Sequence, residues 1–100
     1  NWQAFVEKYP NANMHFATTK APRHYCQVSY GPDDFLVFGR ETRGLPETLL
    51  KANYGRCVRI PMREGARSLN LSNSVAVIVF EALRQTGFEN LRLAGPFPQA

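Results

Sequence analysis

Two apolar segments, about twenty residues apart, each lead into a loop rich in glycine, arginine, serine or asparagine and then toward a helix. The first segment is 36–46, and the second joins 60–62 to the polar stretch 67–76. The uninterrupted apolar run at 35–38 is typical of a strand that is covered on both faces of a parallel sheet. Two strand ends that carry such loops can build one ligand crevice, because the carboxyl ends of parallel strands meet at the same edge.

The rest of the chain alternates between the patterns of strands and helices. The expected strands are 14–19, 35–38 and 56–60, and the expected helices are 46–53 and 72–86. An amphipathic helix ends at Pro10, and segment 24–30 is compatible with either a short helix or a short strand. Ser72 is a suitable N-cap, and Gly87 is a suitable residue to follow the last helix. This alternation predicts an α/β domain with a mostly parallel sheet and flanking helices.

The composition is that of a folded domain with a positive charge. One hundred residues make one small domain, and 44% hydrophobic with 20% charged residues fits a globular chain rather than a disordered one. The net charge of +4 favours a polyanionic partner such as RNA, because lysine and arginine release condensed counterions when they meet phosphates. A mildly basic soluble protein without such a partner is the alternative.

The cysteine and histidine positions do not predict a metal site. Cys26 and Cys57 match no metal-ligand spacing and are expected to be buried small hydrophobic residues in a reducing compartment, where a disulfide is not required. His15 is expected within a strand and His24 at the surface. No apolar stretch approaches the roughly 18 residues of a membrane span, and no signal peptide is visible. The predicted location is therefore cytoplasmic, with no membrane partner.

The helix expected at 72–86 is apolar on nearly all sides of its first half. Residues 75–80 read Val-Ala-Val-Ile-Val-Phe, without a polar face. Such a helix is expected to be buried on both sides. One side belongs in the core of the domain. The other side predicts a homodimer interface, because a domain of this size cannot cover every face of a central helix.

Polar residues gather just before this helix. Ser68, Asn70, Ser72 and Asn73 fall within six residues, and helix capping explains only one or two of them. They predict a shaped polar pocket, with a buried polar turn as the alternative. Gly39, at the end of the preceding strand, would allow a ligand to approach the backbone closely, although an ordinary strand-to-loop glycine fits as well.

Together these two segments resemble motifs two and three of the SpoU branch of the SPOUT family, the knotted AdoMet-dependent RNA 2′-O-methyltransferases. The sequence GRETRGLP at 39–46 and the sequence SLNLSNSVAVIVFEALRQ at 68–85 are most similar to the short members that modify the wobble nucleotide, cytidine or uridine 34, of tRNA. The resemblance extends from Phe16 to Phe88, and Arg40 stands where those members usually carry proline.

The resemblance implies a fold, a cofactor and partners. The fold would be an α/β domain with a deep trefoil knot at its carboxyl-terminal end. A bent AdoMet would bind in the knot, largely through backbone groups, and a homodimer would modify tRNA without a metal. The cofactor-binding positions carried over by motif are Ala17, Gly39, Ile60 and Ser68.

Other motif residues receive roles from the same resemblance. Arg43 is the candidate catalytic residue, near the ligand or the RNA, while Asn73 braces the knot loop. Glu41 and Asn70 support the motif. Glu41 and Arg43 could instead form a structural ion pair, which is usually worth little at a surface.

The first motif of the family, which carries an arginine implicated in catalysis, has no match in this chain. We therefore expect residues 1–100 to be the carboxyl-terminal part of a single methyltransferase domain, which binds AdoMet better than it catalyses. The expected function is AdoMet-dependent methyl transfer to a ribose 2′-hydroxyl of tRNA at the wobble nucleotide. The alternative is a knotted RNA-binding or ribosome-associated module without turnover, which would not bind AdoMet.

Overall fold

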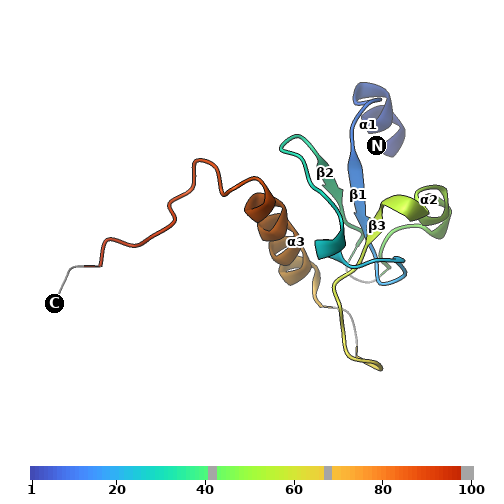
Figure 1. Ribbon diagram of the computed structural model, residues 1–100. Coiled ribbons are helices and arrows are strands. Elements are labelled where there is room, and N and C mark those ends of the chain that lie inside the picture. Colours follow the sequence, from blue (N-terminus) through green and yellow to red (C-terminus); the bar gives the residue numbers. More distant parts are fainter. Residues whose placement is uncertain (41–42, 67–68, 98–100) are drawn as a thin grey trace.

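A parallel sheet of three strands forms the centre of the described chain. The computed structural model describes residues 1–40, 43–66 and 69–97. The strands are β1 (Met14–Ala17), β2 (Phe35–Val37) and β3 (Cys57–Val58), in the order β2-β1-β3 (Figure 1). Met14 lies opposite Phe35, and Phe16 lies opposite Cys57. The predicted α/β class with a parallel sheet is confirmed, and β1 takes the central position.

Three α-helices and two short 3-10 helices accompany these strands within the described residues. They are α1 (Trp2–Lys8), η1 (Tyr25–Gln27), α2 (Glu47–Ala52), η2 (Tyr54–Arg56) and α3 (Leu71–Gln85). In Figure 1, α3 lies on one side of the sheet, and α1 and α2 lie on the other. In the described part of the chain, we find no helix with both the length and the apolar character that a membrane crossing requires.

Two apolar clusters, one on each face of the sheet, make up the core. In the first cluster, Phe16 and Cys57 pack with Leu50 of α2 and are fully buried themselves. In the second cluster, Val58 packs with Ile78 of α3. Cys57 and Val58 belong to different clusters because successive residues of a strand point to opposite faces.

The apolar run at 35–38 is divided between these two clusters. Phe35 and Val37 pack against the first cluster, and Leu36 and Phe38 pack against the second. β2 is therefore covered on both faces, as the unbroken apolar run predicted.

The long helix begins earlier than the sequence predicted. α3 starts at Leu71, and its N-cap is Asn70 rather than Ser72. The side-chain oxygen of Asn70 accepts a hydrogen bond from the backbone N–H of Asn73 at 2.9 Å, which satisfies one of the N–H groups that the first turn leaves without a partner. Gly87 follows the C-cap with a φ of 80°, as expected for this position.

The segment around η1 differs most from the expectation. β3 ends at Val58 rather than at residue 60, since Arg59 pairs instead with the chain before η1 through its backbone N–H, which donates to the carbonyl of Arg23 at 3.0 Å. His24 is half-buried rather than on the surface, and its ring accepts a hydrogen bond from the N–H of Cys26 at 3.3 Å. This turn places Cys26 outside the core, so the prediction of a buried Cys26 is wrong, whereas Cys57 is buried as predicted.

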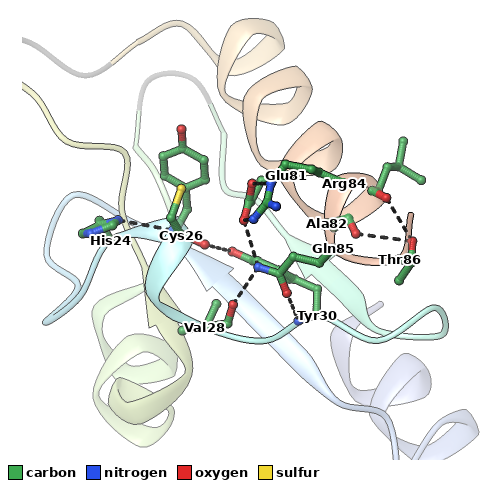
Figure 2. Close-up of polar contacts among 11 residues, drawn as sticks. His24, Cys26, Val28, Tyr30, Glu81, Ala82, Arg84, Gln85 and Thr86 are labelled. Atoms are coloured by element: carbon green, nitrogen blue, oxygen red, sulfur yellow. Dashed lines mark hydrogen bonds and ion pairs between the residues drawn. The ribbon is translucent and has the colours of Figure 1, made fainter. Parts of the chain in front are cut away.

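A polar network fixes α3 against the segment that follows η1 (Figure 2). The amide of Gln85 accepts a hydrogen bond from the N–H of Tyr30 and donates one to the carbonyl of Val28, both at 2.9 Å. Buried Glu81 accepts hydrogen bonds from Arg84 and Gln85. These bonds lower the pKa of Glu81 to about 2, so its carboxylate is ionised at neutral pH. One amide that serves two backbone groups fixes the register of α3 on this segment.

Candidate functional site

A cavity of about 290 Å³ opens at the carboxyl ends of the three strands. Its walls come from the residues that follow each strand and from the beginning of α3. The lining includes 17–20 at the end of β1 and after it, 38–40 and 43–45 after β2, 58–60 at the end of β3 and after it, and Leu71, Ser74 and Ile78 of α3. Open parallel sheets bind their ligands at this edge. The volume is close to the lower end of small-molecule sites, which begin at roughly 300 Å³.

Gly39 shapes the wall of the cavity after β2. A Cβ atom on Gly39 would overlap the backbone of Gly44 and Leu45, so only glycine lets these two parts of the loop cross. The N–H of Gly44 donates to the carbonyl of Arg40 at 2.8 Å, and Gly44 has a φ of 67°. The backbone closest to Gly39 is therefore the chain's own, and this glycine makes a tight loop possible beside the cavity.

Four of the predicted site residues come together here. Ala17, Gly39, Ile60 and Arg43 all line the cavity. Arg43 is exposed at the rim, whereas the other three are half-buried in the walls. Ala17 ends β1, Gly39 and Arg43 follow β2, and Ile60 follows β3, so the parallel arrangement brings them to one edge of the sheet.

The other predicted residues have different places. Asn70 and Asn73 are joined by the cap of α3, and neither belongs to the cavity lining among the described residues. Glu41 and Ser68 lie outside the described residues. From the helix that follows this polar stretch, Ser74 belongs to the cavity lining. The bracing role of Asn73 remains a prediction.

Lys20, Arg40 and Arg59 are cationic residues of the site that were not among the predicted site residues. Lys20 lines the cavity, and its Nζ lies 2.8 Å from Oε1 of Glu47 at the start of α2. Arg59 also lines the cavity, and its guanidinium donates to the carbonyl of Thr19 at 3.1 Å. These hydrogen bonds connect the loop after β1 to the start of α2 and to the residue that follows β3. The signal that could have found the three residues is position, since all three come at or just after the end of an expected strand.

The cavity combines apolar walls with a positive rim. Phe38, Val58 and Ile78 provide apolar surface inside it. The cationic residues of the lining are Lys20, Arg40, Arg43 and Arg59. Across the described lining there is no aspartate or glutamate. Apolar walls suit a flat aromatic ring, and a rim of one charge raises the local concentration of anionic partners.

A second polar cluster lies at the amino-terminal edge of the sheet. Oδ2 of Asp34 accepts hydrogen bonds from the N–H of Gly31 at 2.8 Å and from the amide of Asn13 at 2.9 Å, and it lies 2.8 Å from Nε2 of His15. Burial alone would raise the pKa of Asp34, but these three bonds outweigh burial and lower it. An ionised carboxylate only accepts, so His15 is the donor in this pair.

This second cluster contains one carboxylate and one imidazole. In the ranges that the structure describes, no group of three or more His, Cys, Asp or Glu side chains is arranged to hold a metal ion. The buried His15 packs its ring against Tyr30 at 4.6 Å, so the cluster joins β1 to the turn before β2. Its contacts are those of a structural group rather than of a ligand site.

Comparison with known proteins decides the family. The family model of the SpoU rRNA Methylase family matches residues 1–80, which contain all three strands and most of α3. This chain belongs to the SpoU rRNA methylase family. The resemblance inferred from the two loop motifs is thereby confirmed, and the cavity of this SpoU chain lies where those motifs meet.

Relatives of the SpoU chain include proteins with stated tRNA activities. A tRNA (cytidine(34)-2′-O)-methyltransferase from Burkholderia ambifaria is 52% identical over 93 residues, covering 89% of this chain and 59% of the relative. A solved structure concerned with the 2-OH methylation of C/U34 on tRNA is 36% identical with a TM-score of 0.79, covering 86% of this chain and 53% of that one.

A third relative was solved with a ligand. The structure of an AdoMet-bound rRNA methyltransferase from Sinorhizobium meliloti is 30% identical to the SpoU chain with a TM-score of 0.67, covering 82% of this chain and 32% of that one. The SpoU chain thus spans about half the length of the curated relatives it matches, between 46% and 59%.

Proposed function

We propose that this chain is the cofactor-binding part of a cytoplasmic, AdoMet-dependent tRNA 2′-O-methyltransferase that acts on the wobble nucleotide. Residues 1–100 would form the carboxyl-terminal part of one methyltransferase domain. The observation that carries the proposal is the cavity at the carboxyl edge of the sheet, because Ala17, Gly39 and Ile60 line it together. The names of the relatives that act on nucleotide 34 of tRNA support the substrate.

The cavity fits a ligand of the kind that AdoMet represents. Its apolar walls suit an adenine ring, and Ser74 and the exposed backbone of the loops offer polar partners. When bound, AdoMet supplies an electrophilic methyl group on a sulfonium. Ala17, Gly39 and Ile60 would hold the cofactor in place, and Ser68 is proposed to contribute as well, as the motif implies.

Methylation of a ribose also requires the 2′-hydroxyl to be oriented and to lose its proton. A hydroxyl is a weak nucleophile at neutral pH, so a positioned group must accept or direct that proton. Among the described lining residues there is no carboxylate or imidazole. The described part of the cavity therefore contributes mainly binding and orientation. Arg43, exposed at the rim, is the proposed catalytic residue that contacts the ligand or the RNA.

The fold proposal includes the trefoil knot that the motif resemblance implies. In such a knot the carboxyl-terminal segment passes through a loop of the same chain. Gly39 and Gly44 belong to one wall of the cavity, and Leu71 and Ser74 at the start of α3 belong to another, which supports a close association of this loop with the helix.

Titration with AdoMet tests the cofactor assignment. We expect the chain to bind AdoMet and Ala17→Leu to weaken binding at least tenfold, because three added carbon atoms enter the cavity and overpacking costs about 1–3 kcal/mol. Calorimetry measures both affinities. Ala52→Leu, at the exposed end of α2, adds the same atoms outside the cavity and is the matched control. Equal affinities in Ala17→Leu and in the control would contradict the site.

The reaction class is tested with labelled AdoMet and a tRNA pool. Label on the ribose of nucleotide 34 is the expected result, and label on a base would contradict the reaction class. Binding of tRNA by a chain that fails to bind AdoMet would instead support the RNA-binding module without turnover.

We also propose that the protein is a homodimer through the outer face of α3. Ala76 and Phe80 are exposed on this face, Phe80 by 57%, while Ile78 faces the core. Beyond α3 the chain runs away from the sheet in Figure 1, and Leu91 and Leu93 are exposed on it. Exposed apolar side chains on two consecutive segments are typical of a surface that binds a second copy of the chain.

Phe80→Glu is expected to give a monomer that remains folded. Phe80 is the large apolar side chain on the exposed face, so a charge there disfavours association without disturbing the core. Light scattering at micromolar concentration measures the mass. Tyr54→Glu, at a similarly exposed aromatic on η2, should leave the dimer intact. Val79→Glu is a poorer test, because Val79 lines a groove beside Tyr30 and its replacement would also damage the monomer. A monomeric unmodified chain would contradict the dimer.

A further inference from the structure

We propose that Lys20 contacts a backbone phosphate of the RNA at the mouth of the cavity, and that Glu47 holds Lys20 in place until the RNA arrives. This inference rests on the proposed function, because it assumes that RNA reaches the positive rim of the cavity. It adds a named phosphate contact and a competing carboxylate, neither of which follows from the motifs.

The ion pair between Lys20 and Glu47 is easily broken. Nζ of Lys20 lies 2.8 Å from Oε1 of Glu47, and the two side chains are 62% and 64% exposed. An ion pair with this much solvent around it contributes little to stability. Lys20 can therefore leave Glu47 for another anion at small cost, whereas the pair orders its side chain at the rim beforehand.

The backbone around Lys20 is held in place independently of Glu47. Arg59 donates to the carbonyl of Thr19 at 3.1 Å, and the N–H of Lys20 donates to the hydroxyl of Thr18 at 3.2 Å. A preorganised backbone lets the Lys20 side chain change partners without reshaping the loop. The pKa of Glu47 is lowered by the hydrogen bond and the charge of Lys20 and, to a smaller extent, by the charge of Lys51. When Lys20 moves to another anion, the carboxylate of Glu47 therefore still has the positive charge of Lys51 nearby.

The position of Lys20 favours a phosphate outside the cavity over a carboxylate of the cofactor inside it. Lys20, Arg40 and Arg43 are all exposed, so their charges face solvent at the opening rather than the interior. Aspartate and glutamate are absent from the described lining of the cavity, and Glu47, which pairs with Lys20 beside the opening, is the carboxylate that a polyanion would displace. A chain of phosphates that crosses the opening would meet several of these cations at once, and each contact releases counterions.

Binding of unmodified tRNA, measured by fluorescence anisotropy over a series of KCl concentrations, tests the proposal. Lys20→Gln should weaken binding by about three- to tenfold and reduce the salt slope by about 0.7–0.9, the value for one lost phosphate contact. Glu47→Gln should strengthen binding severalfold, because it removes the competing carboxylate. Lys8→Gln removes the same charge from exposed α1, away from the cavity, and should have the smaller effect.

The double variant distinguishes an effect of Glu47 that acts through Lys20 from a general effect of its charge on RNA binding. If Glu47 acts through Lys20, Glu47→Gln should give no gain in a chain that already carries Lys20→Gln. The same gain in both backgrounds would overturn the role of Glu47, and equal losses for Lys20→Gln and Lys8→Gln would overturn the contact.

Parallel calorimetry with AdoMet distinguishes this inference from the proposed function. Weaker AdoMet binding with unchanged tRNA binding in Lys20→Gln would assign Lys20 to the cofactor and overturn the proposal. Lys20-dependent tRNA binding by a chain that does not bind AdoMet would support the phosphate contact while contradicting the proposed methyltransferase.

Discussion

Gly39→Ala is expected to destabilise the chain by about 3 kcal/mol and to lower AdoMet affinity about a hundredfold. The added Cβ would overlap backbone atoms of Gly44 and Leu45, which cannot rotate away as a flexible side chain can. The loop after β2 must therefore open, and it forms one wall of the cavity. Urea unfolding followed by circular dichroism measures the stability, and calorimetry measures the affinity.

Gly44→Ala is the matched control for this prediction. Gly44 has a φ of 67°, so alanine costs about 1 kcal/mol in backbone strain, but a Cβ there would have no atom within 4 Å. We expect this variant to lose some stability and to keep most of its AdoMet affinity. A Gly39→Ala chain that is no less stable than Gly44→Ala would show that the two parts of the loop do not cross as described.

The crossing at Gly39 illustrates what the sequence can and cannot predict. The apolar run at 35–38 predicted a strand covered on both faces, and β2 is such a strand. The motif predicted that Gly39 belongs to the site, and it lines the cavity. The reason why position 39 must be glycine was not predictable. It depends on how closely the backbone of Gly44 and Leu45 passes Gly39 in space, and a sequence pattern does not contain that distance.

Helix ends and strand ends were less predictable than the elements themselves. Ser72 and Asn70 are both good N-cap residues, and only the geometry of the first turn selects Asn70. The turn that begins at His24 exposes Cys26, although cysteine is usually buried. Local propensity allows both outcomes, and tertiary contacts decide between them.

The polar contacts between distant segments were not predictable at all. Gln85 joins α3 to Tyr30 through a pair 55 residues apart in the chain, and Lys20 joins Glu47 over 27 residues. A polar residue in a helix or a loop is ordinary in sequence. Its partner becomes evident only when the sheet order brings the two segments together.

Asp34→Asn is expected to lower the free energy of unfolding by about 2 kcal/mol at pH 7, since hydrogen bonds to a charged group contribute about 1.5–3 kcal/mol. Oδ2 of Asp34 is within hydrogen-bond distance of Gly31, Asn13 and His15, and the side chain is 13% exposed. All three contacts converge on this one oxygen, and an amide oxygen in its place carries no charge to strengthen them. Urea unfolding at a series of pH values measures the difference from the unmodified chain.

The pH dependence of this difference follows from the direction of the pKa shift. The three hydrogen bonds outweigh the opposing effect of burial and lower the pKa of Asp34 in the folded chain, whereas an unfolded aspartate titrates near about 3.9. A lowered folded pKa contributes stability that is fully present above the unfolded pKa and is lost as the pH falls through the folded one. The difference between Asp34→Asn and the unmodified chain should thus shrink as the pH falls below about 4.

Asp33→Asn removes the same charge from the exposed neighbouring residue and is the control for net charge. An equal loss of stability in both variants, or a difference that does not shrink in acid, would mean that the charge of Asp34 does not hold β1 to the turn before β2.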